Sequence, residues 1–311
     1  FISLEMNSSF TFIFIDGYVG LNKYKYLFFL IMLTVYILII LSNCVIVYLI
    51  WTHQNLHGPM YIFIAALSLN SLLFSTNIYP KLLIDSLSDR PIISYQACLV
   101  QYFLFYALGS ADFLLLAAMA YDRYVSICKP LWYGSIMTSR AVISLLFLSW
   151  FVSASQIAVT AIVSADQKLC HFTLRGIFCH NSFFRLHCRT SRIVTVNGLL
   201  ALVLLALLPM LFILFTYMRI LLVSYRSSRE VRKKAAETCF PHLLVLLSFS
   251  TLAAFNIITP RLEHSLSRTV HLVMTLQVIL YNPLLNPIIY GLKMKEISKH
   301  LNKLLCNSKK R

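Results

Sequence analysis

The chain has 311 residues, of which 59% are hydrophobic and only 12% are charged, and its mean hydropathy is +0.76. About a quarter of the residues in a typical soluble domain are charged, so this composition excludes a soluble globular protein and indicates a membrane protein. The net charge is +16, but the basic residues gather in short links between apolar blocks. That placement favours the anionic face of a membrane, and we expect no nucleic acid as partner.

Residues 1–26 precede the first long apolar block and form a predicted N-terminal segment. They contain no positively charged stretch that leads into a cleavable apolar region, so we predict no secretory signal peptide. Met6 is a candidate start of translation, with residues 1–5 upstream of it. Asn7 opens an Asn-Ser-Ser acceptor sequence for N-glycosylation. The alternative is a chance match to a short motif, but its position at the start of a membrane protein favours its use.

Seven blocks nearly free of charge follow, each close to the ~20 residues that a helix needs to cross a bilayer. They cover residues 27–51, 60–79, 97–121, 141–163, 193–217, 240–258 and 270–290. Membrane strands would instead appear as alternating segments of about ten residues. We therefore predict an all-α membrane protein, with a bundle of seven transmembrane helices over residues 27–291.

Lysine and arginine counts predict how the chain is oriented. The links on the same side as residues 123–140 hold 16 basic residues, against 11 on the other side, and a dense basic run lies within residues 226–234. Cytoplasmic links carry the excess of basic residues. The N-terminus is therefore predicted to be extracellular and the C-terminus cytoplasmic.

The third block ends in an unusual string. Residues 119–133 read Met-Ala-Tyr-Asp-Arg-Tyr-Val-Ser-Ile-Cys-Lys-Pro-Leu-Trp-Tyr. Asp122 and Arg123 are adjacent at a membrane border, where ionisable groups are costly unless they are paired or near water. They predict an ion pair at a helix end that can open and close; the alternative is a solvated helix end with a snorkelling arginine. Pro130 opposes continuation of the helix.

This string closely resembles the signature after the third helix of odorant receptors, a branch of the rhodopsin-like G-protein-coupled receptors. It departs from the family pattern only at Ser126, where the family has alanine. Residues 233–243, Lys-Lys-Ala-Ala-Glu-Thr-Cys-Phe-Pro-His-Leu, resemble a second family string. Residues 283–290, Pro-Leu-Leu-Asn-Pro-Ile-Ile-Tyr, resemble the Pro-x-x-Asn-Pro-x-x-Tyr element of the seventh helix. The three strings occur in the family's order.

The resemblance implies a plasma-membrane receptor that binds a small odorant from outside. It also implies activation of a heterotrimeric G protein of the olfactory stimulatory type, which raises cyclic AMP. Asp122 would restrain Arg123 at rest, and Arg123 would turn toward the G protein on activation. The full set of implied switch residues is Asp122, Arg123, Tyr124, Tyr217, Asn286, Pro287 and Tyr290.

Two other classes remain as alternatives, a non-olfactory rhodopsin-like receptor and, further off, a small membrane transporter. A transporter would need several polar residues that converge at the middle of the membrane. We find no metal-ligand pair at helical spacing inside a block and no Ser-His-Asp set in suitable surroundings. We therefore predict no enzymatic activity, no catalytic residues, no metal and no cofactor.

Candidate ligand-binding residues follow from helical spacing upstream of Asp122. The spacing places several of them on one face of the third helix, where a pocket between helices three, five, six and seven would lie. They are Tyr102, Phe105, Tyr106, Gly109 and Ser110. Plain helix packing is the alternative for each of them.

Polar residues inside the other blocks are also informative. Asp112 is a lone acid within the third block, which predicts either a functional group or a hydrogen-bonded packing network. Ser71 stands where many relatives hold a sodium-linked aspartate, so the resemblance puts sodium modulation in doubt. Trp150 matches the tryptophan expected in the fourth helix and is predicted to anchor packing. Asn43 is predicted to hydrogen-bond a neighbouring helix.

Four cysteines belong to the outward side of the predicted bundle: Cys98, Cys170, Cys179 and Cys188. Three histidines lie among them in the link of residues 164–192, so metal binding competes with disulfide formation. We favour disulfides, for which four cysteines allow three pairings. The resemblance implies the pairs Cys98–Cys179 and Cys170–Cys188. Five basic residues against one acid make this link positive, which would favour anionic ligands.

The last block contains Pro287, which removes a backbone hydrogen bond and predicts a kink, with Asn286 able to satisfy the freed groups. Residues 292–311 then form a predicted cytoplasmic segment. Its leucines and isoleucine alternate with lysines in the manner of an amphipathic helix that lies at the membrane surface.

Overall fold

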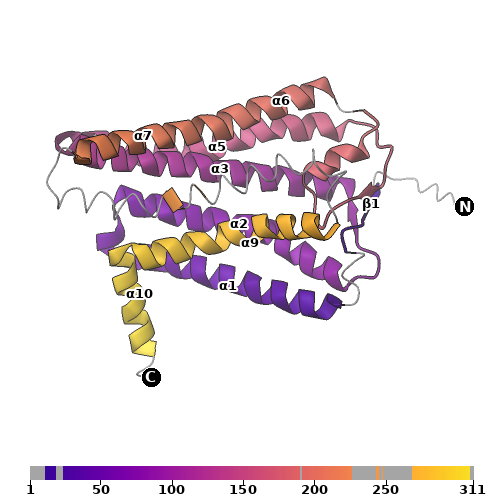
Figure 1. Ribbon diagram of the computed structural model, residues 1–311, viewed down its shortest axis with the longest axis horizontal. Helices are drawn as coiled ribbons and strands as arrows, with labels where there is room; N and C mark the ends of the chain where they lie inside the picture. Colours follow the sequence, from indigo (N-terminus) through magenta and orange to yellow (C-terminus); the bar gives the residue numbers. More distant parts are fainter. Residues whose placement is uncertain are drawn as a thin grey trace, which may run out of the picture.

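The computed structural model describes residues 11–18, 24–189, 191–225, 243, 244, 247 and 268–308. Long helices dominate these ranges and lie roughly side by side, and short strands gather at one end (Figure 1). Asn7, the basic run at 226–234 and nearly all of the sixth block fall outside the described residues.

The long helices match the predicted blocks. Their bounds are α1 Lys25–Thr52, α2 Pro59–Leu87, α3 Tyr95–Cys128, α5 Ser139–Ala165, α6 Arg192–Leu202, α7 Leu208–Tyr225 and α9 Arg268–Lys293. A π-helical turn, η5 Val203–Leu207, joins α6 to α7 without a break. Within the described residues, five helices are long and apolar enough to cross a membrane, counting α6 to α7 as one. Helix α9 coincides with the seventh predicted block.

Local signals set the helix ends. Pro59 occupies the first turn of α2, where its missing N–H costs nothing. Ser94 and Thr138 cap α3 and α5, since their hydroxyls accept hydrogen bonds of 3.3 Å from backbone amides one turn on. Helix α3 ends at Cys128, two residues before Pro130, as the proline predicts. The predicted position of the Asp122–Arg123 pair is wrong, however: the pair lies inside α3, about one and a half turns before its end.

Short helices fill the connections between the long ones. Their bounds are η2 Gln54–Leu56, η3 Pro130–Trp132, α4 Tyr133–Ile136 and η4 Asn181–Leu186. Helix α10, Lys295–Ser308, follows α9 after one residue and turns away from the bundle (Figure 1).

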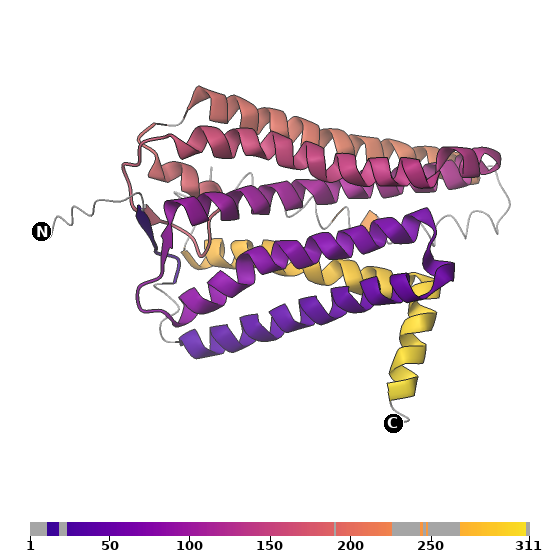
Figure 2. The same cartoon turned by 180° about the vertical axis from the view of Figure 1, so that it is seen from behind.

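Helix α3 lies at the centre of the bundle. It contacts α2, α5 and α7, while α1 packs against α2 and α9. Seen from behind, α1 and α2 cross the near side and α9 lies beyond them (Figure 2). A change in the position of α3 would therefore reach most of the other long helices.

The all-α prediction misses a small sheet. Strands β1 Phe12–Ile15, β2 Ile92–Ser94 and β3 Thr173–Leu174 form it in the order β2-β1-β3. Strand β1 is antiparallel to β2 and parallel to β3. The segments have only two to four residues, too few for an alternating pattern to stand out in the sequence. We call this end of the bundle the sheet end and the opposite end the Arg123 end.

The turn after β1 packs closely against the link between α5 and α6. A Cβ atom on Gly17 would lie 2.4 Å from the backbone carbonyl of Gly176, so this approach requires glycine. Next to it, the hydroxyl of Tyr18 donates to the carbonyl of Ile177 at 3.0 Å. The N-terminal strand is thus fixed to the sheet end of the bundle.

Two large apolar clusters fill the bundle, one toward each end. Many apolar side chains on the outer faces of the helices stay exposed. On α5, for example, Phe147 and Phe151 stack on each other while 61% and 56% exposed. A soluble protein rarely exposes such faces, whereas lipid covers them in a membrane.

The prolines of α9 are compensated by other helices. Pro283 and Pro287 lack the N–H groups that would bond the carbonyls of Ile279 and Pro283. Tyr79 of α2 donates to the first carbonyl at 3.2 Å, and Asn43 of α1 donates to the second at 2.9 Å. The expectation that Asn286 satisfies the freed groups is therefore wrong, because these groups bond to α1 and α2.

Candidate functional site

The Arg123 end contains a closed ion pair within α3. Asp122 is fully buried, and its Oδ2 accepts hydrogen bonds from Nε of Arg123, at 2.9 Å, and from Nη2 of the same guanidinium. The side chain of Arg123 is only 16% exposed. A buried carboxylate needs such partners because it has lost its hydration.

Tyr133 completes the contacts of Asp122. Its hydroxyl donates to Oδ1 of Asp122 at 2.8 Å across the turn between α3 and α4. Burial, and then the bond to Asp122, raises the pKa of Tyr133 above its ordinary value, so the hydroxyl stays protonated and donates. The sequence did not reveal this role, although Tyr133 is the last residue of the string at 119–133.

The other predicted switch residues surround one apolar cluster. Tyr217 and Tyr290 belong to the buried cluster at the Arg123 end, 4% and 1% exposed, and Tyr124 packs against it. Asn286 is buried and donates to the hydroxyl of Ser71 at 3.5 Å. Side chains of α3, α7 and α9 therefore meet beside the ion pair.

Asp112 belongs to a network in the middle of the bundle. Asp112 is 3% exposed and accepts a hydrogen bond from Nδ2 of Asn70 at 2.8 Å. The amide oxygen of Asn70 accepts from Nε1 of Trp150 at 3.1 Å. The predicted packing role of Trp150 thus includes a hydrogen bond, and the network joins α2, α3 and α5.

Asp112 and Ser71 both take part in hydrogen bonds to other helices. The N–H of Asn70 faces Asp112, and the hydroxyl of Ser71 accepts from Asn286. The doubt about sodium modulation that Ser71 raises stays a prediction.

At the sheet end, the structure joins Cys98 to Cys179 and Cys170 to Cys188, with Cα–Cα distances of 5.4 and 4.8 Å. These are the two pairings that the resemblance implies. Within the described residues, no group of three or more histidine, cysteine and acidic side chains could hold a metal.

His187 precedes Cys188 of the second disulfide and contacts Tyr95, the first residue of α3. Its Nε2 lies 3.0 Å from the hydroxyl of Tyr95, which gives its own proton to the carbonyl of Ser164. His187 therefore donates from Nε2, and its buried Nδ1 has no hydrogen-bond partner. Burial lowers the pKa of His187.

The candidate ligand residues divide into two groups. Tyr102 and Phe105 are each 5% exposed and pack against the loop, where ring centroids lie 5.7 Å from Tyr102 to Phe183 and 5.2 Å from Phe105 to Phe178. They act as packing residues that support this loop.

Tyr106, Gly109 and Ser110 lie on the more open part of the same helix and are half-buried. No described atom lies within 4 Å of a Cβ placed on Gly109. The hydroxyl of Ser110 donates to the carbonyl of Tyr106 at 2.6 Å. Among the described residues, Gly109 is therefore a position of α3 against which no other segment packs closely.

The charges of the link between α5 and α6 lie on its surface. Arg175, Arg185 and Arg189 are exposed at the sheet end. The prediction that this link favours anionic ligands stays a prediction.

Comparisons with known proteins agree with the motifs. The sequence model of a family described as "Olfactory receptor" matches residues 32–308. Olfactory receptor 11A1 of Homo sapiens is 33% identical over 93% of this chain and 92% of its own length. Olfactory receptor 1 of Rattus norvegicus and olfactory receptor 1E16 of Mus musculus are each 33% identical over 92% of both chains.

Proposed function

This chain belongs to the olfactory receptor family, and on that basis we propose that an odorant bound near Gly109 of α3 opens the ion pair at Arg123 and activates a stimulatory G protein. The chain is a multi-pass plasma-membrane protein that acts as an olfactory receptor. Our proposal concerns the residues that perform this function and the direction in which they act.

The single observation that carries the proposal is the closed ion pair. Asp122 holds Arg123 through two nitrogen atoms, and Tyr133 holds Asp122 from the other side. All three groups lie where α3 meets the η3–α4 turn. Separation of the pair would free a guanidinium, which binds backbone carbonyls or acids of a partner protein.

Exposed apolar side chains next to this pair suit a protein partner. Leu131 is 95% exposed and Trp132 is 66% exposed in η3, directly before Tyr133. Exposed large apolar residues that project beyond a membrane protein's lipid-facing belt mark interaction surfaces. A G protein bound there would contact η3 and reach Arg123.

The ligand end and the partner end share one rigid element. Gly109 and Arg123 both lie on α3, about 20 Å apart along its axis. An odorant bound next to Gly109 would bias the position of α3 against α7 and α9, whose Tyr217 and Tyr290 pack beside the ion pair. A ligand shifts such an equilibrium only by the difference between its affinities for the two states.

The same scheme assigns the remaining segments. Residues 1–26 and the sheet end face outward, residues 27–291 form the receptor bundle, and residues 292–311 lie in the cytoplasm. Within α10, Ile297 is fully buried while Lys299 and Lys303 are exposed. This division suits a helix at the surface of an anionic membrane.

Cyclic AMP in cells that express the full chain with an olfactory stimulatory G protein tests the coupling. The cells are challenged with amino acids, organic acids and volatile aldehydes, alcohols and ketones. We expect at least one class to raise cyclic AMP, and Arg123→Ala to abolish the rise at unchanged surface expression. A response of full size in Arg123→Ala would refute the coupling scheme.

Gly109→Leu tests the position of the ligand. A leucine side chain there would occupy the proposed position of the ligand, so we expect the EC50 of the best agonist to rise at least tenfold. Gly198→Leu is the matched control, because Gly198 is an exposed residue of α6 with no described atom within 4 Å of its Cβ position. Equal effects of the two variants would place the ligand elsewhere.

A further inference from the structure

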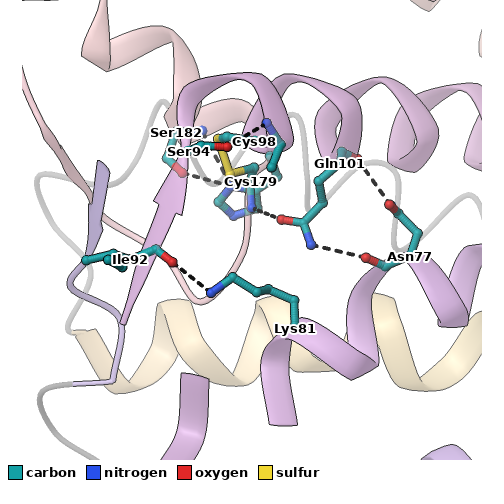
Figure 3. Close-up of a disulfide and its surroundings, with 10 residues drawn as sticks. Asn77, Lys81, Ile92, Ser94, Cys98, Gln101, Cys179 and Ser182 are labelled. Atoms are coloured by element: carbon teal, nitrogen blue, oxygen red, sulfur yellow. Dashed lines mark hydrogen bonds between the residues drawn. A yellow bond between two sulfur atoms is a disulfide. The ribbon is translucent and has the colours of Figure 1, made fainter. Parts of the chain in front are cut away.

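Gln101 of α3 occupies a special position between the loop and α2. It lies one turn after Cys98, on the side of α3 that faces both Cys179 and Asn77 (Figure 3). Gln101 is 5% exposed, and a buried amide is costly unless its hydrogen bonds are made.

The side-chain oxygen and nitrogen of Gln101 each make a hydrogen bond to the backbone of another segment. Its Oε1 accepts from the backbone N–H of Cys179 at 2.9 Å, and its Nε2 donates to the backbone carbonyl of Asn77 at 3.1 Å. The side chain of Asn77 in turn donates to the carbonyl of Gln101 at 3.1 Å. A backbone N–H can only donate and a carbonyl can only accept, so one amide orientation alone satisfies both bonds.

We propose that Gln101 is a positioning residue that clamps the loop after Cys179 at a fixed height over the odorant chamber. The proposal rests on the proposed position of the ligand next to Gly109. The disulfide joins the Cys179 side chain to α3 but makes no bond to the backbone N–H of Cys179. The hydrogen bond from the Cys179 amide to Gln101 fixes this part of the loop backbone against α3. Through the bond from Gln101 to Asn77, it also fixes the loop relative to α2.

The loop held in this way would form the roof of the proposed chamber next to Gly109. Phe178 and Phe183 flank the clamped residue and are each at most 2% exposed. Their rings pack on Phe105 and Tyr102, which lie one and two turns before Gly109 in α3. A loop that rises would lift these two rings from α3 and open the chamber from above, so Gln101 would set which ligand sizes fit.

Hydrogen exchange in the purified full-length receptor tests the clamp without any ligand. In Gln101→Met, which keeps the length of the side chain but removes both bonds, we expect the amide of Cys179 to exchange ten- to thirtyfold faster. Helix α5 should exchange at the wild-type rate. Gln54→Met, the same change at an exposed glutamine in η2, is the control and should leave the loop unchanged.

Gln101→Glu separates the two bonds. Its carboxylate still accepts from Cys179 but cannot donate to Asn77, so we expect intermediate protection at neutral pH. Protonation at low pH restores a donor, and the protection factor should then approach that of the wild type. A purely structural role for the side-chain volume would not produce this rescue.

A chemical probe tests the roof. In Gly109→Cys, the rate of labelling by a neutral methanethiosulfonate reagent, followed on the peptide that contains residue 109, reports access to the chamber. We expect Gln101→Met to raise this rate at least fivefold while the Cys98–Cys179 bond stays intact. Unchanged exchange at Cys179, or unchanged labelling, would overturn the proposal. Because neither measurement uses an agonist, their failure is distinct from a failure of the proposed coupling.

Discussion

The bond between Tyr133 and Asp122 offers a quantitative test of the resting state. Tyr133→Phe removes one hydroxyl and keeps the ring, so Asp122 loses the donor at Oδ1 while its contacts with Arg123 remain. A hydrogen bond to an ionised group contributes about 1.5–3 kcal/mol. Because Arg123 still compensates the charge of the fully buried carboxylate, we take the lower end, about 1.5 kcal/mol.

That free energy corresponds to about a tenfold change in the ratio of open to closed receptor. Basal cyclic AMP, normalised to receptor at the cell surface, should therefore rise up to about tenfold in Tyr133→Phe without ligand. Tyr121→Phe is the control, since Tyr121 packs against the apolar cluster at the Arg123 end but is not among the implied switch residues. Basal activity within twofold of the wild type, at equal surface expression, would show that Tyr133 does not hold the closed state.

Three further predictions concern stability in purified receptor. The lowered pKa of His187 means that the folded state binds a proton at this imidazole less readily than the unfolded chain does. The stability of the receptor should therefore fall as the pH drops below about 6.5. His187→Phe should flatten the dependence of the melting temperature on pH. Asn43→Ala leaves the carbonyl of Pro283 without its donor and should cost about 1–3 kcal/mol, seen as a lower melting temperature at every pH. Gly17→Ala forces a Cβ to within 2.4 Å of the Gly176 backbone; we expect faster proteolysis of the N-terminal strand, and wild-type cleavage rates would contradict the close packing.

The spans that are long and apolar could be predicted from the sequence because each contains its own signal. The bounds of α1 and α5 lie within two residues of their predicted blocks. Helix α3 runs seven residues past the predicted end of its block, to Cys128. Charged residues at 122 and 123 suggested a helix end there, but the two charges compensate each other inside the helix.

Contacts between distant segments were harder to predict. The donation from Asn43 to the carbonyl of Pro283 joins residues 240 positions apart, and it depends on which helices are neighbours. Tyr133 belongs to a family string, yet its contact with Asp122 arises from the η3–α4 turn that follows Pro130. The hydrogen bonds of Gln101 could not be predicted from the sequence, because no sequence pattern around a single glutamine in an apolar helix indicates which groups it bonds.

The sheet also constrains the order in which the protein can be made. Strand β1 precedes β2 and β3 in the chain and is synthesised before them. It is the central strand of the sheet, so it needs a partner on each side. Tyr18 finds its acceptor at Ile177, 159 residues later. Helices α1, α2, α3 and α5 must therefore be synthesised before the N-terminal segment can reach its final place. If synthesis stopped within α5, strand β3 would be missing and one edge of β1 would stay unpaired. Cellular quality control could recognise this unpaired edge as a feature of an incomplete receptor.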